Sequence, residues 1–262
     1  MTHPKNVWFT EDNQILVSMG YPSNPYQFRL FDQDGILVKS LKTGSDIYDD
    51  QIFHCQYIGN HRIGMVVADR NFMIHLIDFS GKVQTKTIML NTGKAGCLPE
   101  KFWFTEDSLI TLDRLSGKII LFDLETGLES DRFSLVDENQ RQVLYRPLVM
   151  QGMENQLYLL DPFVRCLFVY ELSSGSYLRS IPLPAFPIMN DEQVLLKILN
   201  PNEILLLDSG SGQLYYWDSI SWFPQERDPS LISWQNPISM DYREGCLVVN
   251  DTGHERLQKY CP

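Results

Sequence analysis

Short runs of hydrophobic residues alternate with polar turns along the whole chain, and no stretch keeps the spacing of an amphipathic helix. The runs are rich in Val, Ile, Tyr, Phe and Trp, which favour extended strands. The pentapeptide that begins at Trp8 recurs 95 positions later, at Trp103. This interval is close to twice the length of a four-stranded propeller blade, so the pattern predicts a repeated β-sheet unit.

Each predicted unit contains four strands, and the second strand of most units ends in an aspartate. These aspartates recur about every 45 residues, which is typical of propeller blades. They are Asp69, Asp113, Asp161, Asp208 and Asp251. We therefore predict an all-β, six-bladed β-propeller of four-stranded antiparallel blades in a single domain. The predicted blades cover approximately residues 5–47, 48–97, 98–144, 145–190, 191–234 and 235–262.

Three segments depart from this scheme. The first unit has a longer loop, from Tyr21 to Tyr26, which we expect to protrude and to contact a ligand. The Pro-containing stretch 219–234 is expected to replace the regular fourth strand of blade five. The last unit stops after its third strand, so residues 257–261 form an open edge unless the N-terminal segment covers them. A homo-oligomer through this edge is one consequence of an incomplete last blade.

The last unit resembles the NHL repeat. The resemblance covers residues 237–241 and 245–260, and it is closest over the segment Asp251-Thr252-Gly253-His254-Glu255-Arg256-Leu257. His254 and Glu255 stand there in place of the Asn-His pair that is usual in the family. The resemblance implies a six-bladed propeller. Such propellers include RNA-binding, protein-binding, amidating-lyase and lactonase-like or esterase-like members, so the resemblance leaves the function open.

The charge balance argues against several classes of partner. The chain has 22 Lys and Arg against 33 Asp and Glu, a formal net charge of -11. This charge opposes binding to phosphate backbones, so we expect no DNA partner, and RNA binding is disfavoured. Anionic lipid surfaces are opposed in the same way, and no apolar run is long enough to span a bilayer. No membrane partner is expected.

The five cysteines are scattered along the chain and form no Cys-x-x-Cys pair. An odd number at such spacing indicates neither a disulfide framework nor a zinc knuckle. The first residues contain no apolar signal-peptide segment. These features predict a cytoplasmic protein.

Two sets of loops share one face of a propeller: those between the second and third strands, and those that enter each blade. We expect this channel-mouth face to bind the ligand through aromatic rings and cations. The candidate residues are Tyr21, Tyr26, Arg70, Phe72, Arg146, Phe163, Arg165 and His254. The arginines suit an anionic ligand or an acidic peptide. The recurring aspartates are interpreted as structural, because a carboxylate at a turn accepts loop N–H groups.

Acidic and amide residues that enter the first strands suggest a calcium site at the same mouth. Ca²⁺ takes about six to eight oxygen ligands. The candidates are Asp50, Glu100, Asp191 and Asn236. Solvated turn residues are the favoured interpretation of this set. A zinc site is not expected, because the five histidines do not supply three that converge.

Taken together, these features favour a binding module that recognises a protein, a peptide or a small ligand on the channel-mouth face. No nucleotide-binding or nucleophile motif occurs, and no cofactor is implied apart from the candidate Ca²⁺. The alternative is an enzyme at the same mouth: a Ca²⁺-dependent hydrolase of the lactonase or esterase kind, or a lyase or cyclase. The sequence does not decide whether the protein is an enzyme.

Overall fold

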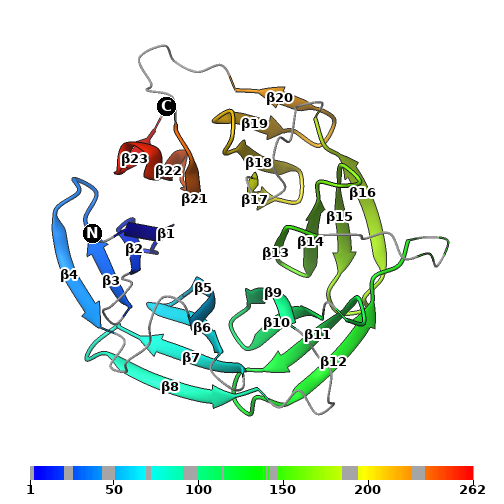
Figure 1. Cartoon of the computed structure of the whole chain (residues 1–262), viewed down its shortest axis with the longest axis horizontal. Helices are drawn as coiled ribbons and strands as arrows, with labels where there is room; N and C mark the ends of the chain where they lie inside the picture. The colour runs from blue at the N-terminus through cyan, green and yellow to red at the C-terminus, as the bar shows by residue number, and fades with distance from the viewer. Residues whose placement is uncertain are drawn as a thin grey trace. The chain divides into compact units, whose positions relative to one another are not determined.

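In the computed structural model, nearly all of the regular secondary structure of the described residues is β-strand (Figure 1). The structure describes residues 3–20, 26–42, 51–68, 72–90, 99–113, 115–137, 139, 141, 147–184, 194–225 and 234–261. Within these residues, six antiparallel sheets follow one another along the chain, five with four strands and one with three. The sheets are called blades one to six below. The predicted all-β class and the predicted number of blades are confirmed.

The chain divides into two compact units, and the first unit contains blades one, two and six. Its elements are β1 (His3–Phe9), β2 (Ile15–Gly20), β3 (Gln27–Phe31), β4 (Leu37–Lys42), β5 (Ile52–Gly59), β6 (Arg62–Ala68), β7 (Phe72–Asp78), β8 (Gln84–Met89), β21 (Pro237–Arg243), β22 (Cys246–Asp251), the short 3-10 turn η2 (Thr252–His254) and β23 (Arg256–Tyr260). Each strand pairs with the next one in its blade.

The second unit contains blades three, four and five. Its strands are β9 (Pro99–Phe104), β10 (Ser108–Asp113), β11 (Lys118–Asp123), β12 (Glu129–Ser134), β13 (Val149–Met153), β14 (Gln156–Asp161), β15 (Cys166–Glu171), β16 (Tyr177–Pro182), β17 (Val194–Asn200), β18 (Glu203–Asp208), β19 (Gln213–Trp217) and β20 (Trp222–Pro224). The fourth strand of blade five was expected to be irregular. It is present as β20, but it has only three residues.

Hydrophobic sheet faces pack against each other between consecutive blades. In the first unit, Phe28 of blade one and Met65 of blade two belong to one buried cluster. In the second unit, Ile119 of blade three lies in a cluster with Tyr170 of blade four. These side chains are 0% exposed, so each blade buries one face against its neighbour in the same unit.

Close contact between blades three and four depends on two glycines. The recurring tryptophan Trp103 packs on Gly152, where an added Cβ would lie 2.5 Å from Trp103 Nε1. At Gly175 an added Cβ would lie 2.4 Å from Phe133 Cγ, and the φ of +68° also favours glycine. Any larger residue at either position would push the two sheets apart.

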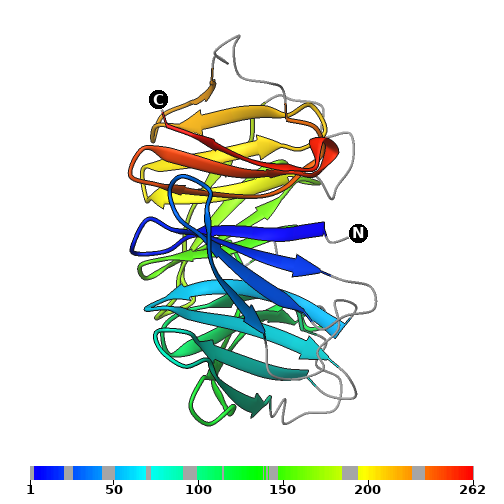
Figure 2. The same cartoon turned by 90° about the vertical axis from the view of Figure 1, so that its left-hand side faces the viewer.

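Blade six lies beside blade one in the first unit, as Figure 2 shows for the red and blue strands. Asp241 Oδ2 on β21 accepts the N–H of Phe9 on β1 at 2.7 Å. Asn250 Nδ2 on β22 donates to the carbonyl of Pro4 at 2.9 Å. Packing and side-chain hydrogen bonds therefore join the first and last blades, and no strand is exchanged between them within the described residues.

The predicted lack of a fourth strand in blade six is confirmed for the described residues. β1 was one candidate to cover the edge of β23, but β1 pairs with β2 as the first strand of blade one. Among the described residues, β23 pairs only with β22. The outer edge of β23 is thus open in the part of the chain that the structure describes.

A disulfide joins Cys246, at the start of β22, to Cys261, directly after β23. The cysteine spacing indicated no disulfide framework, and this pair is a correction. The two residues are 15 positions apart and meet because the hairpin places Leu247 opposite Tyr260. Disulfides are typical of oxidising compartments, so the cysteines no longer support the cytoplasmic prediction.

The described residues contain no helix with the length and apolar character that a membrane crossing requires.

Candidate functional site

The recurring aspartates hold the loops between the second and third strands of their blades. Asp161 is fully buried, and its Oδ1 accepts the N–H of Phe163 at 3.0 Å. Asp208 Oδ1 accepts the N–H of Gly210 at 3.1 Å, and blade three repeats the arrangement. This confirms that the aspartates are structural turn residues. Asp69 lies outside the described residues.

In blade six the equivalent aspartate gathers the side chains of the NHL-like segment. Asp251 is 0% exposed, and its Oδ1 accepts the N–H of Gln235 at 2.7 Å. Asp251 Oδ2 lies 2.7 Å from His254 Nδ1 and 3.1 Å from Arg256 Nη2. His254 was predicted to bind ligand, but its Nδ1 is directed to this carboxylate. The side chains of this segment therefore stabilise the loop itself.

The arginines and aromatic residues predicted as ligand contacts are only partly within the described residues. Arg165 is exposed, but its Nη2 donates to the carbonyl of Pro184 at 2.8 Å, which holds the guanidinium against its own blade. Phe163, at the tip of the same loop, is 70% exposed. Tyr21, Arg70 and Arg146 lie outside the described residues.

Tyr26 does not belong to a ligand surface, contrary to the prediction. Its ring is 2% exposed and lies in the core with Phe28, at 5.5 Å between ring centroids. Its hydroxyl donates to Ser18 Oγ at 2.8 Å, so the polar end of the side chain is satisfied inside the blade. The apolar ring gains more from this burial than from a place in the loop.

The described residues include only two of the four predicted calcium ligands. Asp50 and Asp191 lie outside the described residues, and Glu100 and Asn236 belong to different compact units. The carbonyl of Asn236 accepts a hydrogen bond from Thr252 Oγ1 at 2.6 Å. Within the described residues, no three His, Cys, Asp or Glu side chains are grouped so as to hold a metal ion. The calcium site stays a prediction.

A β-bulge recurs in the first strand of several blades, near the end where the chain enters the blade. The pairing register of β5 with β6 shifts between Ile52 and His54, and that of β21 with β22 shifts between Pro237 and Ser239. Blades one and three have a similar shift. A bulge leaves one residue unpaired and turns its side chain away from the regular sheet face. The unpaired residues include Phe53, Glu100 and Ile238.

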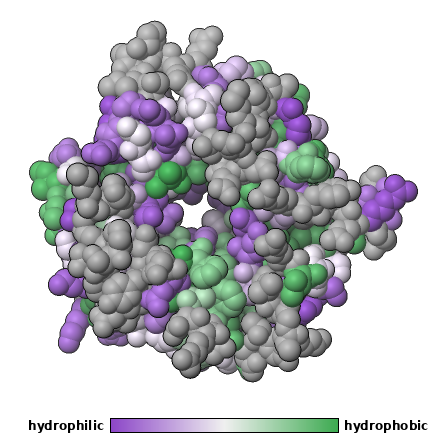
Figure 3. All heavy atoms as spheres, viewed as in Figure 1, coloured by the Kyte–Doolittle hydropathy of each residue, from purple (hydrophilic) through white to green (hydrophobic). Residues whose placement is uncertain are grey.

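The bulge in blade two exposes an aromatic pair formed by Phe53 and Phe72. The rings meet edge to face, with centroids 5.4 Å apart and an interplanar angle of 74°. Phe53 is 56% exposed, and Phe72 at the start of β7 is half-buried. Figure 3 shows hydrophobic surface over β5, near the middle of the view. Phe72 was predicted as a ligand contact, whereas Phe53 was missed.

The bulge in blade six combines an apolar residue with buried polar atoms. Ile238 is 42% exposed. Its neighbour Ser239 pairs with Asn250 across the sheet. Within the described residues, Ser239 Oγ and Asn250 Oδ1 are buried and have no hydrogen-bond partner. Buried polar atoms of this kind are rare, and they are found most often at functional or hydrated sites.

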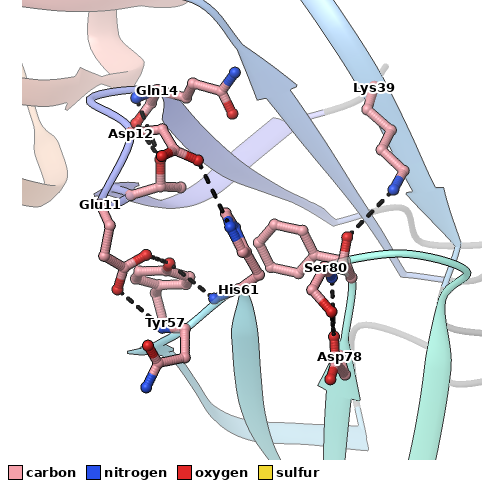
Figure 4. Close-up of polar contacts among 11 residues, drawn as sticks. Glu11, Asp12, Gln14, Lys39, Tyr57, His61, Asp78 and Ser80 are labelled. Carbon is pink, nitrogen blue, oxygen red and sulfur yellow. Dashed lines mark hydrogen bonds and ion pairs between the residues drawn. The ribbon is translucent and has the colours of Figure 1, made fainter.

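A polar cluster joins the first turns of blades one and two (Figure 4). The Tyr57 hydroxyl donates to Glu11 Oε2, and the N–H of Asn60 donates to Glu11 Oε1 at 2.9 Å. His61 Nε2 lies 3.6 Å from Asp12 Oδ2. Burial tends to raise the pKa of Glu11, but the hydrogen bonds from Tyr57 and from backbone N–H groups hold it below the usual value of 4.5. Burial, together with the bond to Glu11, raises the pKa of Tyr57. The cluster therefore acts as a polar clamp between two blades.

Replacement of Glu11 by Gln should lower the free energy of unfolding at neutral pH, and this difference should shrink as the pH falls below 4.5. The folded-state pKa of Glu11 is depressed, so its contribution is complete above 4.5 and is lost as the pH falls through the folded value. We expect a difference below about 1 kcal/mol, since Glu11 is exposed. Urea unfolding of both proteins at pH 7 and pH 3.5 measures it. Glu106→Gln, in the second copy of the pentapeptide, is the control; an equal pH-dependent loss there would contradict this account.

Comparison with known proteins identifies the fold. No protein-family model matches the sequence, and no curated protein matches it. The structure is similar to the crystal structure of the Cps50 (Swd1) β-propeller domain of Myceliophteria thermophila, with a TM-score of 0.57 and 10% sequence identity. The match covers 98% of this chain and 82% of that domain. The chain therefore has a β-propeller fold with six blades. Since 877 solved chains match, the fold alone does not select a function.

Proposed function

We propose that this chain is a protein-binding propeller with NHL-like repeats, and that the aromatic pair Phe53–Phe72 is the centre of its contact surface. Propellers are typical protein-binding modules. This one has an exposed aromatic side chain, Phe53, near the start of β5, where the chain enters blade two. The single observation that carries the proposal is the 56% exposure of Phe53, held edge to face on Phe72 by the bulge of β5.

Aromatic side chains supply much of the binding energy of protein interfaces because they bury a large area at little entropic cost. Phe53 is held in place by Phe72, so little conformational freedom remains to be lost on binding. Ile238, at the equivalent bulge of blade six, is a second exposed apolar residue at such a position. The expected partner is a peptide segment with at least one large apolar side chain.

The NHL-like assignment is supported by the contacts of the last blade. The aspartate, histidine and arginine of the resembling segment converge on one buried carboxylate, Asp251. Residues of a repeat signature that form hydrogen bonds with one another in this way stabilise the fold. Sequence differences in the other blades therefore need not alter the architecture.

Selection of peptides from a random library against the wild-type protein tests the binding function. We expect the selected peptides to share a large apolar anchor, and we expect Phe53→Ala to weaken their affinity about tenfold or more. Phe223→Ala is the matched control, because Phe223 is a phenylalanine with 46% exposure on the short strand β20. Titration calorimetry or fluorescence anisotropy gives the dissociation constants.

An equal loss of affinity in Phe53→Ala and Phe223→Ala would show that the aromatic pair is not the contact surface. Failure to select any peptide with an apolar anchor would argue against a peptide-binding function as a whole.

A further inference from the structure

In blades one to four, the third strand carries one apolar residue that lies opposite an apolar residue of the fourth strand and is fully buried. This residue is Phe28 opposite Leu41 in blade one, Ile74 opposite Ile88 in blade two, Ile119 opposite Phe133 in blade three and Leu167 opposite Ile181 in blade four. All four are 0% exposed. The equivalent residue of blade six is Leu257, six positions after Asp251, just as Leu167 is six positions after Asp161. Leu257 is only half-buried.

Blade five gives an independent comparison. Its equivalent residue is Leu214, which lies opposite the polar residue Gln225, directly after the short strand β20; the Gln225 N–H donates to the Leu214 carbonyl at 2.9 Å. Leu214 is half-buried as well. In two different blades, therefore, this residue is half-buried where the described residues place no aliphatic residue opposite it on a fourth strand. A strand placed beside β23, with an aliphatic residue opposite Leu257, would remove the remaining apolar surface from water.

The backbone groups that such a strand would use can be assigned. The carbonyls of Phe72, Arg165 and Leu214 accept hydrogen bonds from backbone N–H groups on the fourth-strand side of their blades. In an antiparallel sheet, outward-directed groups recur at every second residue. The corresponding residues of blade six are Glu255, Leu257 and Lys259. Leu257 and Lys259 present their backbone groups at the outer edge of β23. Glu255 directly precedes β23 and presents its carbonyl, because its N–H donates to the Thr252 carbonyl at 3.1 Å.

We infer that this edge pairs with β23 of a second copy of the chain, antiparallel and in the register that places Leu257 opposite Leu257. That register supplies the aliphatic neighbour that the complete blades have. It also sets Glu255 of each copy opposite Lys259 of the other, which gives two opposite-charge pairs. Glu255 and Lys259 are both exposed and on the outward-bonding positions. The β23 edge is thus complementary to itself in charge and in apolar contact.

The disulfide supports this use of the edge. Cys246–Cys261 fixes the end of β23 to β22, directly after Lys259 and Tyr260. Arg256 is held from the other end by Asp251. A strand held at both ends keeps its edge extended, so less freedom is lost when it pairs. This inference rests on the last blade alone and is separate from the role proposed for Phe53.

Sedimentation velocity over a range of concentrations tests the inference with charge-swapped variants of the full chain. The wild type should show reversible monomer–dimer association. Lys259→Glu and Glu255→Lys should each weaken it about tenfold, because each places like charges opposite one another at two positions. The double variant Glu255→Lys/Lys259→Glu should restore it. Lys82→Glu, an exposed lysine in a turn of blade two, changes the net charge equally and should have no effect.

A wild type that is monomeric at every concentration would overturn the inference. So would a dimer that both single variants leave unchanged, or a double variant that stays as weak as the single ones. Thermal unfolding of each variant shows whether it is folded. A monomer that instead binds an unrelated extended peptide at β23 would assign the edge to a different partner and would also contradict pairing between two copies.

Discussion

Removal of the disulfide by the double substitution Cys246→Ser/Cys261→Ser should lower the free energy of unfolding by about 3 kcal/mol. The bond closes a loop of 15 residues, and a loop of this length restricts the unfolded chain by about that amount. Blade six has three strands, so it has fewer cross-strand hydrogen bonds than a complete blade to hold β23 in place. Guanidinium unfolding of the oxidised wild type and the double variant gives the difference.

Reduction supplies a matched control for the same prediction. Dithiothreitol should bring the wild type to the stability of the double variant and should leave the double variant unchanged. The remaining described cysteines are Cys55 and Cys166, which are free thiols, and burial raises the pKa of Cys55 well above its usual value. Equal stability of the oxidised wild type and the variant, in the absence of reductant, would contradict a stabilising role for the bond.

The blade pattern could be predicted from the sequence because it is local. Each Asp161-type turn is made within a few residues, and each strand pairs with its neighbour in the chain. The alternation of apolar and polar residues, together with the turn residues, therefore determines most of the fold. The three-stranded arrangement of blade six among the described residues was predictable for the same reason, since it concerns only the strands after Pro237.

The proposed contact surface was less predictable because it depends on register and burial. Phe53 becomes exposed only because one residue of β5 is bulged, and an alternating pattern does not reveal a one-residue shift. Tyr26 was assigned to a loop on composition, but its hydroxyl finds Ser18 inside the blade. Cys246 and Cys261 meet through the hairpin of β22 and β23, which cysteine spacing alone does not describe.

Asp241→Ala should destabilise the protein by about 2 kcal/mol through the contact between blades six and one. Asp241 is 6% exposed, and its Oδ2 accepts the N–H of Phe9 at 2.7 Å. The alanine variant leaves that buried N–H without its acceptor, and a bond to a charged acceptor contributes more than a neutral one. The same position in blade four is Gln151, whose Oε1 accepts the N–H of Ile198 at 3.2 Å.

Variants at the two positions separate the effect of a hydrogen-bond acceptor from the effect of its negative charge. Asp241→Asn keeps an oxygen that can accept from Phe9, so it should recover more than half of the stability lost in Asp241→Ala. Gln151→Ala removes a longer bond to a neutral acceptor and should cost about 1 kcal/mol. Urea unfolding midpoints at pH 7 measure all three variants. If Asp241→Ala and Gln151→Ala lower the stability equally, the negative charge of Asp241 adds no stability where the last blade meets the first. Apolar packing, such as that of Val7 against Val248, would then hold these two blades together.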